Sequence, residues 1–217
     1  MTESYKIVYK GGTGELTEKK SRFIADIRPV ETEEEALAFI EEIRKKYWDA
    51  RHHCYAYTIG DRGQTARCSD DGEPSQTAGK PMMDVLMGEE LHNVCAVVTR
   101  YFGGTLLGTG GLVRAYSGAL KEGLLSCRIV EKKLAALLWV SAEYTDSGKI
   151  QYTALQSGID ILDTQYTDSV AFTFLVPVSR EGEFQARLTE CTAGRAVIKR
   201  VRETYYGLDE GELILFD

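Results

Sequence analysis

The sequence has no uninterrupted apolar run of the roughly 18 residues that a membrane-spanning helix needs. Its first residues also lack the basic-then-apolar pattern of a secretory signal peptide. The five cysteines are widely spaced, odd in number and form no CxxC pair, which argues against a disulfide framework or a zinc knuckle. We therefore expect a cytoplasmic protein with no membrane partner, whose cysteines are reduced and mostly buried.

An excess of basic residues is also missing. The formal charge is −7, and the parts of the chain before and after residue 131 each contain more acidic than basic residues. Binding to nucleic acid through bulk positive charge is therefore not expected, and DNA is not an expected partner. A local basic patch on an acidic surface is still compatible with this composition.

At 217 residues and 43% hydrophobic content, the chain is long enough for two ordinary globular domains. The first 30 residues alternate in short β-like runs, with Gly11, Gly12 and Gly14 as turn material. Thr32 and Glu35 form a capping box for an amphipathic helix. The spacing of apolar residues predicts helices over 33–47, 81–91 and 112–126, and strands over 53–59 and 94–101.

The rest of the chain has a different rhythm. Strands are predicted over 133–142, 159–166, 170–178 and 196–205, and helices capped by Thr145 and by Ser179 over 146–156 and 180–191. This βαββαβ order is that of a ferredoxin-like domain. We therefore place a domain boundary between 1–131 and 132–217, with the final residues GELILF as a possible extra strand.

Two glycine-rich blocks are unusual for an α+β sequence. They are DDGEPSQTAGKP at 70–81 and VTRYFGGTLLGTGGLVRAY at 98–116. Five of the nine residues from 103 to 111 are glycine, which indicates positive φ angles or a backbone that another group approaches closely. Backbone N–H groups before a helix bind anions well. The candidate anion or RNA surface comprises Lys80, Arg100, Gly103, Gly104, Gly108, Gly110, Gly111 and Arg114.

The formal nucleotide motifs fail in both blocks. The third glycine of GxGxxG is Val113, and the Walker spacing would need glycine at Pro74 and Ser or Thr at Pro81. Tight turns and close packing of helix on strand explain the glycines equally well, and this architectural alternative is favoured.

Other groups of reactive side chains have simpler explanations. His52, His53 and Cys54 suggest a metal site or a Cys–His pair, but neighbours on a strand point to opposite faces, so hydrogen-bonded histidines are favoured. Asp70, Asp71 and Glu73 suggest acid–base chemistry or Mg²⁺, against an Asp-Gly turn with solvated charges, which is favoured. No catalytic residue, metal or cofactor is expected.

Basic residues also gather near the end of the chain, at Arg195, Lys199, Arg200 and Arg202. Odd and even positions both carry charge, so no single face of a strand is expected to collect them.

The motifs HHCYAY, SDDGEPSQTAGKP and VTRYFGGTLLGTGGLVRAY resemble the signature of the IMPACT family and its bacterial YigZ group. The resemblance covers nearly the whole chain. It implies an α+β protein with a two-layer N-terminal domain similar to the second domain of ribosomal protein S5, and a ferredoxin-like domain similar to the C-terminal domain of elongation factor G. The matching signature-loop positions are His53, Tyr55, Asp71, Gly72, Glu73, Pro74, Thr77, Gly79 and Pro81.

Two positions depart from the family pattern. Gln76 stands where glycine is common, and Leu106 where many relatives have lysine. Because the missing lysine removes a cation from the loop, it weakens the interpretation as a phosphate site.

The resemblance implies a non-enzymatic binding protein that regulates translation through the ribosome, RNA or a translation factor, because the eukaryotic IMPACT protein binds the activator of an initiation-factor kinase. Two alternatives stay open. One is a phosphate- or nucleotide-binding protein or enzyme that uses the glycine loops, and the other is an adaptor for protein interactions. The oligomeric state is left open by the sequence.

Overall fold

The computed structural model describes residues 2–216, and internal contacts divide the chain into two compact α+β units. One unit runs from Ser4 to Glu131, and the other begins at Lys132. The division falls inside the long strand β8 (Arg128–Ala142). Among the described residues, no helix combines the length and apolar character that crossing a membrane requires.

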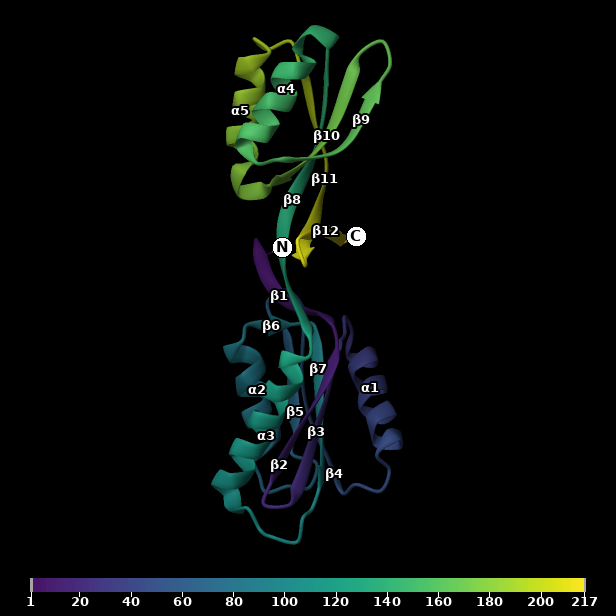
Figure 1. Cartoon of the computed structure of the whole chain (residues 1–217), viewed down its shortest axis with the longest axis vertical. Helices are drawn as coiled ribbons and strands as arrows, with labels where there is room; N and C mark the ends of the chain where they lie inside the picture. Colours follow the sequence, from purple (N-terminus) through teal and green to yellow (C-terminus); the bar gives the residue numbers. More distant parts are fainter. Residues whose placement is uncertain (1, 217) are drawn as a thin grey trace. The chain divides into compact units, whose positions relative to one another are not determined.

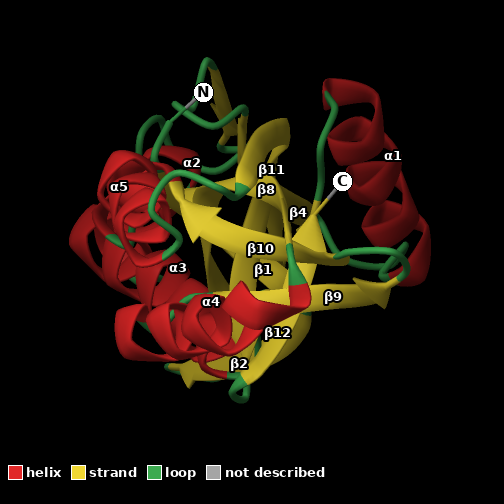
Figure 2. Ribbon diagram, turned by 90° about the horizontal axis from the view of Figure 1, so that it is seen from above, coloured by secondary structure: helices red, strands yellow, loops and turns green. Residues whose placement is uncertain are grey.

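The N-terminal unit is built on a five-stranded antiparallel sheet in the order β2-β3-β7-β4-β5. Helices α2 and α3 lie on one side of this sheet and α1 on the other (Figures 1 and 2). A short strand, β6, pairs in parallel with β1. The elements are β1 (Ser4–Lys10), β2 (Gly12–Glu18), β3 (Ser21–Pro29), α1 (Glu33–Lys46), β4 (His52–Ile59), β5 (Thr65–Ser69), α2 (Gly79–Gly88), β6 (Leu91–His92), β7 (Val94–Tyr101) and α3 (Gly108–Leu125).

The central strand β7 is buried on both faces, which is why its sequence is almost continuously apolar. On one face, Ala96 and Val98 join the core beneath α2 and α3. On the other face, Cys95 and Val97 pack under α1. Helix α1 therefore adds a third layer to the predicted two-layer arrangement.

The second unit has the predicted βαββαβ order, and its sheet has the strand order β9-β10-β8-β11-β12. Both helices lie on one side of this sheet (Figure 1). The last strand of the order is the predicted extra strand. After β8 the elements are α4 (Tyr144–Ser157), β9 (Asp160–Tyr166), β10 (Val170–Pro177), a 3₁₀ turn (Val178–Arg180), α5 (Glu181–Cys191), β11 (Val197–Asp209) and β12 (Glu212–Phe216).

The early glycines do not form the turn that was predicted for them. Gly12 and Gly14 lie within β2, where a Cβ on Gly14 would approach the backbone nitrogen of Gly123 in α3 to 2.3 Å. The turn is made by Lys19 and Lys20, whose φ angles of 45° and 67° are those of a two-residue hairpin. Glycine is needed in β2 because the helix backbone lies directly against the strand.

Some helix starts also differ from the prediction. The capping box of α1 is confirmed, since Glu35 N–H donates to Thr32 Oγ1 at 3.2 Å. The other two caps were wrong: Thr145 lies inside the first turn of α4, and Ser179 lies in the 3₁₀ turn before α5. Helix α3 begins at Gly108, four residues before the predicted start. The glycine run is therefore partly helical.

Candidate functional site

The first glycine-rich block is a loop that leads into α2, and its backbone N–H groups surround a carboxylate of the protein. Asp70 accepts hydrogen bonds from the N–H groups of Gln76, Ala78 and Gly79 at 2.8, 2.9 and 2.9 Å. Burial acts to raise the pKa of Asp70, but these donors outweigh it and hold the pKa below its ordinary value. The anion position ahead of α2 is therefore filled by Asp70 itself.

Gly79 has a packing role in the same loop. A Cβ at this position would lie 2.7 Å from the carbonyl carbon of Ser69, so only glycine lets the start of α2 approach β5. Lys80, the next residue, is exposed and forms an ion pair with Asp84 one turn later in α2.

Asp71 and the two histidines connect this loop to β4. The Asp71 carboxylate accepts the backbone N–H of His53 at 2.6 Å, and its carbonyl accepts a hydrogen bond from His52 Nδ1 at 2.9 Å. His53 Nε2 donates to the carbonyl of Tyr47 at 3.1 Å. The His52 ring therefore holds the loop, whereas the His53 ring holds the residue that follows α1. Within residues 2–216, no three His, Cys, Asp or Glu side chains are grouped so that they could hold a metal ion.

Cys54 lies between these contacts and is fully buried. Its Sγ donates to the Asp70 carbonyl at 3.0 Å, and burial strongly raises the pKa of the thiol. A thiol held in its neutral form is a poor nucleophile.

A buried ion pair ties the first block to the second. Glu73 and Arg100, whose side chains are 4% and 7% exposed, meet at 2.7 Å between Oε1 and NH1. The same Oε1 accepts the hydroxyl of the buried Tyr116 at 2.7 Å. The Arg100 guanidinium also lies 5.4 and 5.5 Å from the ring centres of Phe23 and Phe102. These signature residues therefore join the loop, β7 and α3.

The second block, from Gly103 to Gly111, is more open. A Cβ on Gly103 would lie 2.0 Å from the carbonyl carbon of Lys20, and the φ angles of Gly104 and Gly108 are +86° and +70°. Among the described residues, no side chain caps the start of α3, and its first turn contains no acidic residue. Gly104, Gly108 and Gly110 are exposed, and Gly111 packs on Leu107. Close packing therefore explains why glycine is needed at Gly103 and Gly111, but it does not explain the glycine at Gly110.

Beside this block lies a hollow of about 670 Å³, which we call the Phe102 hollow. Its wall includes an interstrand contact, because the Tyr101 hydroxyl donates to Asp49 Oδ1 at 2.7 Å. Burial, together with this carboxylate, raises the pKa of Tyr101 to about 12. The hollow is lined by Asp49, Ala50, Arg51, His52, Arg100, Tyr101, Phe102 and Leu106.

Large apolar side chains that face solvent lie in the wall of the Phe102 hollow and next to one of its lining residues. Phe102 is 56% exposed and Leu106 is 83% exposed. Trp48, directly before the lining residue Asp49, is 81% exposed. Such residues in a loop on a rigid sheet are typical of a binding surface.

Cations without an ion-pair partner among residues 2–216 gather at the same end of the unit. Arg51 lines the hollow, and Lys20 is the backbone neighbour of Gly103. Lys19 shares the β2–β3 turn, and Arg114 lies one turn into α3 beside Gly110. Figure 1 shows the β2–β3 turn, the α1–β4 loop and the β7–α3 loop together at this end. An acidic chain thus has a local basic and aromatic surface.

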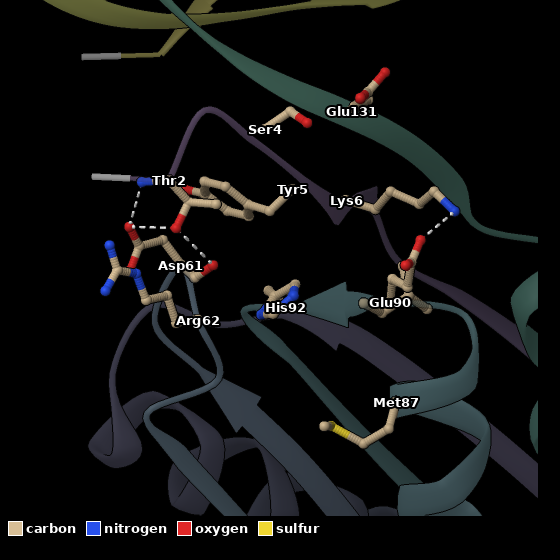
Figure 3. A pocket seen from close by; sticks show the side chains of 11 residues that line it. Thr2, Ser4, Tyr5, Lys6, Asp61, Arg62, Met87, Glu90, His92 and Glu131 are labelled. Carbon is tan, nitrogen blue, oxygen red and sulfur yellow. Dashed lines mark hydrogen bonds and ion pairs between the residues drawn. The ribbon is translucent and has the colours of Figure 1, made fainter.

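A second cavity of about 470 Å³ lies near the start of β1 (Figure 3). Its polar groups pair largely with one another. Thr2 N and Oγ1 donate to Asp61 Oδ2 at 3.0 and 3.1 Å, and Lys6 Nζ lies 3.3 Å from Glu90.

The structure brings together some of the residues that sequence reasoning selected and separates others. Arg100 joins the two blocks through its ion pair with Glu73, and Arg114 lies beside the second block. Lys80 forms an ion pair with Asp84 on α2. The sequence analysis missed Trp48, Arg51, Phe102 and the Lys19–Lys20 turn. For Trp48 and Phe102, the signal that could have found them was an aromatic residue within three positions of an arginine, at the end of a predicted element.

Comparisons with known proteins match both units. Residues 19–124 match the Impact N-terminal domain, and residues 140–195 match a domain of unknown function, DUF1949. The chain is 43% identical over 205 residues to IMPACT family member YvyE of Bacillus subtilis (strain 168), with 94% of each chain covered. It is 38% identical over 187 residues to IMPACT family member YigZ of Escherichia coli (strain K12), covering 85% of this chain and 92% of YigZ. A crystal structure of "an hypothetical protein" shares 36% identity, with a TM-score of 0.59, covering 93% of this chain and 99% of its own.

Proposed function

The chain belongs to the IMPACT family, and on that premise we propose that it is a non-enzymatic, cytoplasmic binding protein that acts in translation by contacting single-stranded RNA. The contact surface is the Phe102 hollow with its border of exposed aromatic residues and cations. The observation that carries this proposal is the exposure of Phe102, which lines the hollow with Arg51, and of Trp48, which directly precedes the lining residue Asp49.

The chemistry of this surface matches that of an RNA strand. Unstacked bases bind to aromatic rings and to guanidinium planes, and phosphates bind to lysine and arginine. Trp48 and Phe102 supply the rings, while Arg51, Lys19, Lys20 and Arg114 supply positive charge. A duplex would bury its bases away from these rings, so single strands are the favoured ligand.

The acidic residues of the first glycine-rich block are engaged in structural contacts, which does not favour acid–base catalysis. Asp70 is held by three backbone N–H groups, and Glu73 by Arg100 and Tyr116. Each carboxylate therefore has a structural partner in the folded chain. The translation role extends the family resemblance to this chain, and binding to RNA is the physical route by which we propose it operates.

The experiment is a fluorescence anisotropy titration of the full chain with a short labelled single-stranded RNA at low salt. Trp48→Ala and Phe102→Ala should each weaken binding by about 1–3 kcal/mol, since one stacked base is lost. Arg51→Ala should make the dependence of log Kd on log salt shallower by about 0.7. The controls are Tyr152→Ala, which removes a 63% exposed aromatic side chain from α4, and Lys121→Ala near the end of α3.

The competing functions give different results in the same assay. If free nucleotides or inorganic phosphate displace the RNA at low concentration, the phosphate-site alternative is favoured. The proposal is overturned if RNA does not bind, or if the hollow variants bind as tightly as the controls. Co-sedimentation with ribosomal subunits at low salt tests the link to translation separately.

A further inference from the structure

The sheet of the second unit has one face that its helices leave uncovered. Even-numbered residues of β8, such as Leu138 and Val140, join the core with Ile150 of α4 and Leu188 of α5. Odd-numbered residues of β8, such as Trp139, point to the opposite face, because side chains alternate along a strand. Figure 1 shows α4 and α5 on one side of this sheet. We call the other side the Trp139 face.

A β-bulge in β11 determines which basic residues reach the Trp139 face. Lys199 lies opposite Trp139, and Arg202 lies opposite Leu137, with a register shift between Arg200 and Arg202. Partners in an antiparallel ladder point to the same side, and a bulge inserts one residue into one strand. Lys199 and Arg202 therefore share the Trp139 face, although one is at an odd and the other at an even position. The expectation that no single face collects all the basic residues agrees with this, because Arg200 lies on the other face.

Arg200 confirms the assignment from the opposite side. It lies opposite Leu138 and donates to Glu181 of α5 at 3.1 Å, so it belongs to the helix-covered face. The side chain of Arg200 therefore lies on one side of the sheet, and those of Lys199 and Arg202 lie on the other. This contrast supplies a matched control.

On the half of the Trp139 face formed by β8 and β11, an aromatic ring and several cations lie around an apolar centre. Lys199 Nζ lies 5.4 Å from the centre of the partly exposed Trp139 ring. Leu137 and Leu175 form the apolar centre with Ala135. These three side chains are buried under neighbouring side chains of the sheet, so the accessible part of the face is the partly exposed Trp139 and the cations around it. Lys133 lies on the same face, opposite Tyr206. Cations therefore follow β8 and β11.

Acidic residues of the Trp139 face lie at its other edge. Asp163 and Asp160 of β9 are opposite Thr173 and Leu175 of β10. The positive half of the face, on β8 and β11, is separated from them by β10. A polyanion would therefore bind along β8 and β11 and avoid β9.

We propose that the β8–β11 half of the Trp139 face binds a segment of single-stranded RNA, with a base stacked on Trp139 and phosphates held by Lys199 and Arg202. Exposed sheet faces of βαββαβ domains that carry aromatic residues bind single-stranded RNA in this manner. Charge complementarity on an otherwise acidic chain selects a polyanion, and the ring selects one with exposed bases. This inference rests on the proposed function and adds a second RNA surface to it.

The two tryptophans of the chain allow each surface to be observed separately. In full-length Trp48→Phe, Trp139 is the only tryptophan and reports on the second unit. In full-length Trp139→Phe, Trp48 reports on the Phe102 hollow. Single-stranded RNA should quench the fluorescence of both proteins, because a base stacked on the indole quenches it.

A charge test on one strand complements the fluorescence test. Lys199→Gln with Arg202→Gln should make the salt dependence of log Kd shallower by about 1.4, or about 0.7 for each lost phosphate contact. Arg200→Gln removes one positive charge from the other face of β11 and should leave the slope at the wild-type value. Because the substituted side chains are exposed, the fold should tolerate these changes.

The outcomes separate the two proposals. If RNA quenches Trp48 alone and the double variant keeps the wild-type slope, the second surface is refuted and the proposed function stands. If RNA quenches Trp139 alone and the double variant loses slope, the second surface stands and the Phe102 hollow is refuted. If RNA quenches neither tryptophan and changes no anisotropy, both proposals fail.

Discussion

In the segment from Asp70 to Pro81, backbone N–H groups ahead of α2 point at the carboxylate of Asp70. At the start of α3, within the glycine run of the second segment, no side chain among residues 2–216 caps the backbone N–H groups of the helix. Both segments have the composition of a phosphate loop. The comparison teaches that glycine content does not show whether backbone donors are available, because a carboxylate from the same loop can occupy them.

The two segments are also stabilised differently. The first is held by the partly buried carboxylate of Asp70 and the buried carboxylate of Glu73. The second packs by backbone approach at Gly103 and leaves Gly104, Gly108 and Gly110 exposed. Substitutions should therefore affect folding in the first segment and mainly binding in the exposed part of the second.

The largest expected effect is at the contact between the segments. Glu73→Gln keeps the shape of the side chain but leaves Arg100 as a buried charge without a counter-ion. We expect the free energy of unfolding to fall by about 3–5 kcal/mol. Urea denaturation measures it.

Glu15→Gln is the matched control, because Glu15 forms an exposed ion pair with Arg22. Its loss should be below about 1 kcal/mol. If the free energy of unfolding falls equally in Glu73→Gln and Glu15→Gln, the buried ion pair does not contribute the stability that we assign to it.

A smaller effect, with a pH signature, is expected from Asp70→Asn. Asparagine cannot offer a charged acceptor to three backbone donors, so the variant should lose about 1–3 kcal/mol at neutral pH. The pKa of Asp70 is lower in the folded chain than its value of about 3.9 in an unfolded chain. The stabilisation is therefore complete above the unfolded-state pKa and decreases as the pH falls through the folded-state value.

Denaturation at neutral pH and in a series of acidic buffers checks this prediction. The gap between wild type and Asp70→Asn should narrow at the acidic end. Asp84→Asn removes the same charge from an exposed carboxylate on α2 and should show no comparable loss. A gap that stays constant with pH would contradict the assigned role of Asp70.

The smallest effect is expected at Gly110. A Cβ there meets only Arg114 NH1 at 3.7 Å, so Gly110→Ala should stabilise the chain by up to about 1 kcal/mol. Gly148→Ala in α4, where a Cβ meets no atom within 4 Å, is the control for helix propensity alone. Thermal unfolding compares the two variants.

The same Gly110 variant sharpens the comparison further if RNA binding is measured as well. A stabilised chain with weaker RNA binding would show that the backbone at Gly110 serves a ligand. A destabilised chain would instead assign Gly110 to packing, like Gly103.

Local patterns in the sequence predicted much of the fold. The apolar spacing of α1 and the Thr32 cap are confirmed, and so is the βαββαβ order of the second unit. The strand β5 was missed because TARCS is short and mostly polar at the edge of its sheet. The β2–β3 turn was missed because two lysines, and no glycine, adopt its positive φ angles.

The sequence by itself determined the order of most elements, the division into two units and the position of both glycine-rich blocks. These follow from periodicity and residue type, which depend on near neighbours. Tertiary structure decided that Asp70 fills one set of N–H groups, that Glu73 reaches Arg100, and that a bulge brings Lys199 and Arg202 to one face. Each of these depends on which distant segments meet in space, and periodicity carries no information about that. The glycines indicated where the backbone is exposed or closely approached. The tertiary structure decided which of these backbone N–H groups are available to a ligand.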